Sequence, residues 1–415
     1  MEASEKAKWT FMVYLAGDNN LETYGTKDLS EMKAVGSTVE VAVVAQFDCM
    51  SDRTTRRYYL TADQTLDADC VAQLPEVNTG DPGALIDFIT WTCQTYPAER
   101  YGLVLWNHGS GWKDEDIYRV ARQHGVADKV TRGQVRGLAS GKPSRALFRT
   151  TLKQLVVEAV EAERAILFDD SSADFLDNQE MRSVLQEAVH RIKQPFDLLG
   201  FDACLMNMLE VHYQIRDMCH LAVGSQEIEP GDGWPYDAVL APLVEDPDMT
   251  PETLGRVIVD AYVDFYRTNH PGMPVTQSAV NLAGVEAVAK AVDGLAQVLE
   301  GSLETRETLG LLFVALRSAQ TFTDRDYIDL AHFCQLLAED DPDGDVGLAA
   351  QRVVDLLIGE TSPLVAERHH GSAVANAHGL SIYLPTRVLS PLYSQLQFAE
   401  RYRWGEFLDA FIHPR

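Results

Sequence analysis

Short apolar and β-branched runs alternate with helical patterns through the first half of the chain, and this alternation limits the possible folds most. Strand patterns are expected near residues 10–16, 39–47, 101–107, 196–202 and 221–226, with an edge strand or hairpin at 56–61. Helical patterns follow Asp18-Asn19-Asn20 up to about Val35 and run from Ala84 to about Thr95. Strands separated by helices usually pair in parallel, so the sequence predicts an α/β fold with a mainly parallel sheet.

The pattern changes near residue 243, where longer helices follow one another. Helices are expected near 250–268, 284–300, 305–320, 326–338 and 346–358, with a return to strand character at 377–384 and a closing helix from 404. We therefore expect an α/β domain at 1–242 and a mostly helical C-terminal region at 243–415 packed on it.

Composition narrows the range of partners. The chain has 415 residues, 46% of them apolar, and a formal net charge of -27. Such a charge repels nucleic acid and anionic lipid, and it would suit cationic peptides, although it is explained equally well as a means of solubility. No apolar run reaches the roughly 18 to 20 residues that a membrane-spanning helix needs.

The cysteine pattern indicates a reduced protein without a thiolate metal site. Six cysteines, at 49, 70, 93, 204, 219 and 334, form no Cys-x-x-Cys pair and no cluster with histidine at zinc-ligand spacing. The apolar run Trp9–Gly17 is interpreted as a first strand rather than as a signal peptide. A cytoplasmic location is the expectation that follows.

Two strand patterns each run into residues that can carry chemistry. His108 follows the run at 101–106, while Asp202 and Cys204 follow the run at 196–201. The carboxyl ends of parallel strands are where ligands gather, and a cysteine with a histidine there suggests a thiol nucleophile with an acid/base partner. Taken singly, such residues are more often part of a core. Gly109 would let a backbone amide approach a substrate, as an oxyanion hole requires.

Several motifs occur in one order along the chain. They are Trp9–Glu22, Trp106–Gly111, Gly200–Met206, Ala222–Glu227 and Gly231–Tyr236. Together they resemble the clostripain-type cysteine peptidases, a family within the caspase and legumain clan. The resemblance implies a caspase-like sandwich with a mainly parallel sheet.

The resemblance also implies roles for individual residues. Cys204 would be the nucleophile of a cysteine endopeptidase, and His108 would protonate the leaving amine. The backbone N–H groups of Gly109 and Cys204 would hold the oxyanion. This is a dyad, so no third orienting residue is assigned.

Two carboxylates are expected to select the residue before the cut. Asp202 lies two residues before Cys204, and Asp232 follows the next strand; family members with this pattern line the specificity pocket with such a pair. Trp234 and Tyr236 would form walls. Buried carboxylates favour arginine or lysine. The alternatives are a helix N-cap for Asp202 and an ordinary turn residue for Asp232.

A basic segment separates the two reactive residues. Residues 113–150 hold nine basic and four acidic side chains, and the segment is either a solvated loop or a site of self-cleavage. Family members mature by such a cut, and the candidates here are Arg132, Arg136, Arg145 and Arg149.

The leading hypothesis is therefore an enzyme, a cysteine endopeptidase that cuts peptides or proteins after arginine or lysine and matures from a zymogen. One alternative is an intracellular protease switched on by an activating partner or ligand, and another is a non-catalytic scaffold with the same fold. No cofactor is expected to be required, and the resemblance leaves a dependence on calcium open.

Overall fold

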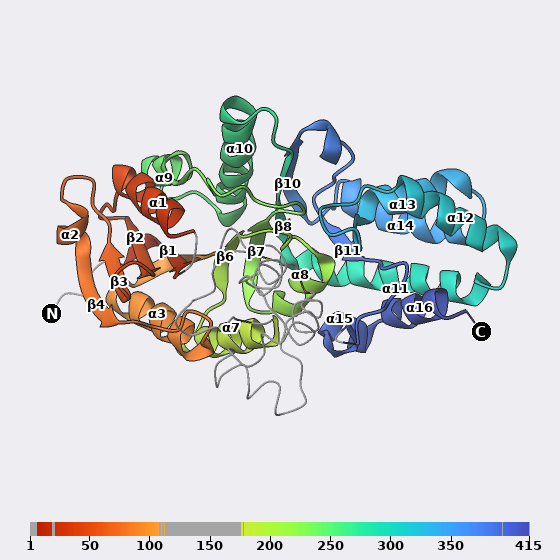
Figure 1. Ribbon diagram of the computed structural model, residues 1–415, viewed down its shortest axis with the longest axis horizontal. Coiled ribbons are helices and arrows are strands. Elements are labelled where there is room, and N and C mark those ends of the chain that lie inside the picture. The colour runs from red at the N-terminus through yellow and green to blue at the C-terminus, as the bar shows by residue number, and fades with distance from the viewer. Residues whose placement is uncertain are drawn as a thin grey trace, which may run out of the picture.

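Nine strands form one central sheet among the residues that the structure describes. This computed structural model describes residues 6–18, 21–107, 109, 112, 176, 178–391 and 393–414 (Figure 1). The strand order is β10-β8-β7-β6-β5-β1-β2-β3-β4. The strands span β1 (Ala7–Gly17), β2 (Val41–Cys49), β3 (Thr54–Tyr59), β4 (Cys70–Pro75), β5 (Ala98–Trp106), β6 (Phe196–Asp202), β7 (Cys219–Gly224), β8 (Val275–Asn281) and β10 (Leu364–His370).

The middle of the sheet is parallel and its two sides are antiparallel. Strands β2, β1, β5, β6 and β7 pair in parallel, whereas β3, β4, β8 and β10 each run antiparallel to a neighbour. The predicted α/β fold with a mainly parallel sheet is confirmed. The expected hairpin at 56–61 is the β3–β4 pair, and β4 is the edge strand.

Helices cover both faces of the sheet. They are α1 (Glu22–Val35), α2 (Leu66–Asp69), α3 (Pro82–Thr95), α7 (Asn178–Ile192), α8 (Leu209–Ile215), α9 (Tyr236–Glu245), α10 (Pro251–Asn269), α11 (Val285–Ser302), α12 (Arg306–Ser318), α13 (Leu330–Asp340), α14 (Asp345–Ile358), α15 (Gln397–Arg401) and α16 (Trp404–Ile412). Figure 1 shows α1, α9 and α10 above the sheet and α3 and α7 below it. Apolar side chains on successive β1 residues join opposite cores, Phe11 the upper one and Met12 the lower.

The sheet crosses the boundary expected at residue 242. Strands β8 and β10 belong to the second half of the chain, yet both extend the central sheet beyond β7. Helices α11 to α16, with the small β9 (Tyr327–Asp329) and β11 (Ser381–Tyr383) pair, lie on the β10 side (Figure 1). One lower core runs without a break from β5 to α13 and α16. The helical C-terminal region is therefore continuous with the α/β domain.

Some helices begin at a residue whose side chain caps the first turn. Asp81 caps α3 and Thr250 caps α10, each by accepting a hydrogen bond from a backbone N–H in the first turn. The expected Asp18-Asn19-Asn20 cap was wrong for α1, because its N-cap residue is Leu21, which makes no side-chain cap.

Candidate active site

Parallel pairing brings the two reactive strand ends together. Trp106 at the end of β5 lies opposite Asp202 at the end of β6. The next residue, Asn107, donates its backbone N–H to the Asp202 carbonyl at 3.2 Å. The segment that follows β5 therefore runs beside the one that follows β6, as the strand patterns predicted.

Gly109 lies directly against the backbone of Cys204. A Cβ atom at Gly109 would stand 2.3 Å from the Cys204 carbonyl oxygen and 2.7 Å from its nitrogen. No side chain fits in this space, so only glycine allows the two backbones to approach so closely. His108, between Asn107 and Gly109, lies outside the described residues.

A sharp turn presents the Cys204 thiol. Leu205 has a φ of 65°. For a residue with a side chain, this left-handed backbone conformation costs about 1–3 kcal/mol relative to the usual β or α conformations. Two contacts hold it there: its side chain is buried, and its N–H donates to the Glu227 carbonyl at 3.2 Å. The partly buried Sγ of Cys204 accepts the Glu229 N–H at 3.3 Å. The segment after β7 thus fixes the position of the thiol.

Asp202 is buried beside this turn and is not a helix N-cap. Its Oδ2 accepts hydrogen bonds from the Trp234 backbone N–H at 3.2 Å and from the Tyr236 hydroxyl at 2.9 Å. Burial raises the pKa of Asp202 to about 6, because these hydrogen bonds only partly offset the loss of water. The Trp234 ring is fully buried against Gly200. Both aromatic residues therefore shape the surroundings of Asp202.

Two further buried carboxyl groups were missed by the sequence interpretation. A Cβ on Gly233 would lie 3.1 Å from Asp202 and 3.3 Å from Asp28 Oδ2, so both carboxyls flank this glycine. Asp28 Oδ2 accepts the Trp106 indole N–H at 2.7 Å, whereas its Oδ1 has no partner. The Glu229 carboxyl lies within hydrogen-bonding reach of the Asp202 carboxyl and of the Trp234 side chain.

These carboxyls hold their protons strongly. Burial, followed by repulsion from Asp202, raises the pKa of Asp28 to about 9 and that of Glu229 well above its usual range. Asp28 Oδ1 and the hydroxyl of Tyr262 are buried without partners in the described part of the chain. Native proteins seldom leave buried polar atoms unsatisfied, so these atoms beside three buried carboxyls indicate a binding site for a polar group.

Asp232 lies near this cluster but is already paired. Its carboxylate contacts Lys27 Nζ at 3.0 Å and His270 Nε2 at 3.1 Å, and 30% of its side chain is exposed. It does not share hydrogen-bond partners with Asp202 among the described residues. The deeply buried carboxyls beside Asp202 are therefore Asp28 and Glu229, which the sequence interpretation missed, whereas Asp232 is partly exposed.

Other expectations fall partly outside the described residues. Arg132, Arg136, Arg145 and Arg149, the candidates for self-cleavage, all lie there. In the described ranges, no group of three His, Cys, Asp or Glu side chains is arranged to hold a metal ion. Of the helices described, none is long and apolar enough to cross a membrane.

The fold and the site define an α/β protein with a thiol next to buried carboxyls at the carboxyl edge of a parallel sheet. The model of the clostripain family matches residues 13–131 and 155–410. The chain therefore belongs to the clostripain family. Clostripain of Hathewaya histolytica is 26% identical over 347 residues, which are 71% of this chain and 56% of that protein. The chain thus spans little more than half of that relative.

Solved structures share the fold at low identity. A secreted C11 cysteine protease from Bacteroides thetaiotaomicron, in complex with an irreversible peptide inhibitor, is similar at a TM-score of 0.65 and 19% identity, over 97% of this chain and 99% of that one. An inactive zymogen C11 protease from Parabacteroides distasonis is similar at a TM-score of 0.64 and 19% identity, over 96% and 98%.

Replacing Gly109 with alanine should destabilise the protein. The added Cβ must push one backbone away from the other, which we expect to cost about 1–3 kcal/mol in the free energy of unfolding. Gly294→Ala in α11 is the matched control, because a Cβ there meets no atom within 4 Å. Urea unfolding of both variants checks this. Equal stability of the two would contradict the close approach at Cys204.

Asp28→Asn should stabilise the protein, and more so at high pH. The folded pKa of about 9 lies above the unfolded value of 3.8, so wild type loses stability as pH rises between these values. The neutral amide avoids this loss and still accepts the Trp106 N–H. We expect a gain of about 1–3 kcal/mol at pH 8 and less at pH 5.

Thermal unfolding at the two pH values measures this difference. Asp237→Asn, which changes an exposed carboxyl in the first turn of α9, is the control and should shift stability by less than about 0.5 kcal/mol. A loss of stability in Asp28→Asn that grows with pH would show that Asp28 is ionised in the folded protein.

Proposed function

We propose that this protein is a cysteine endopeptidase that cuts after arginine, or less readily after lysine. The observation that carries the proposal is the buried Asp202 carboxyl, two residues before the Cys204 thiol, with the buried carboxyls of Asp28 and Glu229 beside it. Membership of the clostripain family supports the thiol chemistry. A similar C11 cysteine protease binds an irreversible peptide inhibitor in its solved structure, which also supports a peptidase function.

In this proposal the dyad is Cys204 and His108. The Cys204 sulfur attacks the scissile carbonyl carbon, and the C–N bond breaks as His108 gives a proton to the leaving amine. Water then hydrolyses the thioester and restores the thiol. The N–H groups of Gly109 and Cys204 are proposed to hold the oxyanion, and the close approach of these two backbones is in keeping with that role.

The buried carboxyls give a reason for a basic residue before the cut. Asp202, with a pKa of about 6, is mostly ionised at neutral pH, and no lysine or arginine of the described residues pairs with it. Asp28 and Glu229 are protonated in the empty site, and a cation would favour their ionised forms. Arginine offers five N–H donors in a planar fork, so it can satisfy several oxygens where lysine satisfies fewer. Binding of an arginine side chain should thus release protons.

We also propose self-cleavage within residues 113–150, at Arg132, Arg136, Arg145 or Arg149. An enzyme that cuts after arginine and carries these arginines between its reactive residues is a substrate for itself. The description of a similar protease as an inactive zymogen is in keeping with an intact precursor. The cleavage experiment described next is repeated with added calcium or EDTA, which tests whether the activity depends on calcium.

Purified wild type and Cys204→Ala test the enzyme directly. We expect wild type alone to release a reporter from arginine-ended peptides, more slowly from lysine-ended ones, and not from aspartate-ended ones. Intact mass should show two fragments that join within 113–150 in wild type and one whole chain in the variant. Removal of the thiol should lower the rate by about 10³-fold or more.

Each readout separates one part of the proposal. Arginine cleavage by an intact chain would remove self-cleavage and keep the peptidase. Cleavage by Cys204→Ala at the wild-type rate would assign the activity to another group or a contaminant. No cleavage by either form, with or without calcium, would favour the scaffold alternative.

The preference for arginine should fall as the pH drops through about 6. Protonation of Asp202 removes the ionised partner of the guanidinium, whereas the neutral isostere citrulline is little affected. The ratio of kcat/KM for arginine over citrulline substrates cancels the titration of the dyad. We expect at least a roughly tenfold fall between pH 7.5 and 5.

Asp202→Asn is the control for this titration. Its arginine-to-citrulline ratio should be low and nearly constant over the same pH range. A wild-type ratio that does not change with pH would exclude Asp202 as the titrating partner of the substrate.

A further inference from the structure

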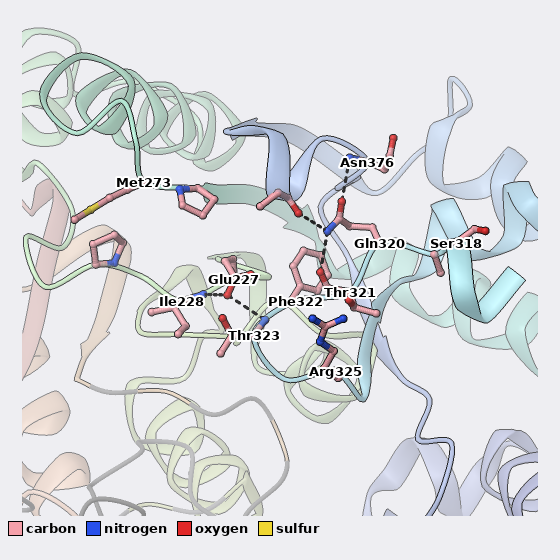
Figure 2. A pocket seen from close by; sticks show the side chains of 14 residues that line it. Glu227, Ile228, Met273, Ser318, Gln320, Thr321, Phe322, Thr323, Arg325 and Asn376 are labelled. Carbon is pink, nitrogen blue, oxygen red and sulfur yellow. Dashed lines mark hydrogen bonds between the residues drawn. The ribbon is translucent and has the colours of Figure 1, made fainter.

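A cleft opens beside the thiol between the catalytic half and the C-terminal region. Its volume is about 790 Å³, and it is lined by parts of residues 227–230, 273–274, 318–325 and 373–376 (Figure 2). The first segment follows β7, and the third follows α12. Segments far apart in sequence therefore form the two walls.

One wall of this cleft is continuous with the site around Cys204. Ile228 and Pro230 line the cleft, and Glu229 between them donates its N–H to Cys204 Sγ at 3.3 Å. The Glu229 side chain is buried near Asp202, so the same short segment serves the proposed specificity pocket. Because an extended chain advances about 3.3 Å per residue, a peptide leaving that pocket along this wall reaches the cleft within two or three residues.

The two walls are held in a fixed relation. Glu227 Oε1 accepts the Ile228 N–H at 2.8 Å and the Thr323 N–H at 3.2 Å, so it links the segments. Gln320 donates to the carbonyls of Thr321 and Ala373, each at 2.8 Å (Figure 2). These polar groups are occupied by the protein itself. The cleft is thus already shaped before a ligand arrives.

The cleft is lined by apolar and polar side chains, and Arg325 is the basic residue among those that the structure places in its lining. Ile228 is 39% exposed and Met273 is 44% exposed, so both offer apolar surface. Arg325 lines the cleft, is exposed, and makes no hydrogen bond or ion pair with the described residues. It favours an acidic group on the ligand.

We propose that this cleft binds the substrate residues that precede the basic residue, with an acidic side chain two or three positions before it paired with Arg325. The inference rests on the proposed function and adds a second determinant to it. The C-terminal region then takes part in substrate selection. Ile228 and Met273 would hold an apolar side chain between the acidic and the basic residue.

Charge reversal at Arg325 tests the pairing. Two sets of internally quenched peptides carry one arginine and differ only in aspartate or asparagine at a single position before or after it. For wild type we expect kcat/KM to favour aspartate about three- to tenfold at one of the two proposed positions, as one partly exposed ion pair allows. In Arg325→Glu the ratio should invert, and Arg325→Gln should bring it close to one.

Arg387→Glu is the matched control, since Arg387 is an exposed arginine outside the cleft. It should keep the wild-type ratio. Because each ratio is taken within one variant, a general loss of activity does not affect it. An unchanged ratio in Arg325→Glu overturns the inference, and so does a change confined to positions after the cut.

Binding separates this inference from the proposed function. If wild type cuts no arginine peptide, the proposed function fails, and the same peptides are titrated into Cys204→Ala and Cys204→Ala/Arg325→Glu by fluorescence anisotropy. Tighter binding of the aspartate peptide that reverses with Arg325→Glu supports the cleft assignment on its own. Equal affinities in both forms overturn it.

Discussion

The parallel register of β5 and β6 determines where every reactive group of this protein can lie. It sets Trp106 opposite Asp202, which places the segments after both strands side by side. The Gly109 backbone then meets Cys204, and the Trp106 indole reaches Asp28 on α1. A slip of one residue in this pairing would turn these side chains to the other face of the sheet. The deep burial of both strands makes such a slip costly.

The same pairing bears on what a cut between 113 and 150 would produce. β5 would belong to one fragment and β6 to the other, yet the two strands are hydrogen-bonded neighbours in the middle of one sheet. Separation would expose strands that are buried on both faces of the sheet. Two fragments would therefore stay together as one body, held by the sheet and its two cores.

The carboxyls around Asp202 illustrate the opposition between stability and function. Asp28 and Glu229 are almost fully buried next to the Asp202 carboxyl, and Asp28 Oδ1 has no partner in the described part of the chain. Each such group costs free energy in the empty protein. Sites prepared for a ligand commonly keep such unsatisfied groups, because the ligand supplies the missing partner.

The sequence was sufficient to predict groups that lie close to strand ends. Asp202, Cys204 and Gly109 follow buried strands directly, so a local pattern located them. Asp28 was missed because its neighbour Gly233 is far away in the chain, although its spacing of four from Met32 puts it on the buried face of α1. β8 was missed because Thr276, Gln277 and Ser278 are polar. They are buried all the same, and Ser278 Oγ donates to the Gly379 carbonyl at 2.6 Å, a partner that no local pattern reveals.

Hydrogen bonds also tie the segments after β6 and β7 to the C-terminal region. Gln226 Nε2 donates to Asp329 at 3.0 Å, and Asn207 Nδ2 donates to the Gly379 carbonyl at 3.1 Å. A chain shortened to the first 242 residues would lose these anchors together with β8 and β10. β7 would then become an exposed edge with unpaired backbone groups, which invites pairing with other chains. The smallest soluble unit of this protein therefore extends through β10, and truncation at the change of sequence pattern would give an aggregating fragment rather than a minimal enzyme.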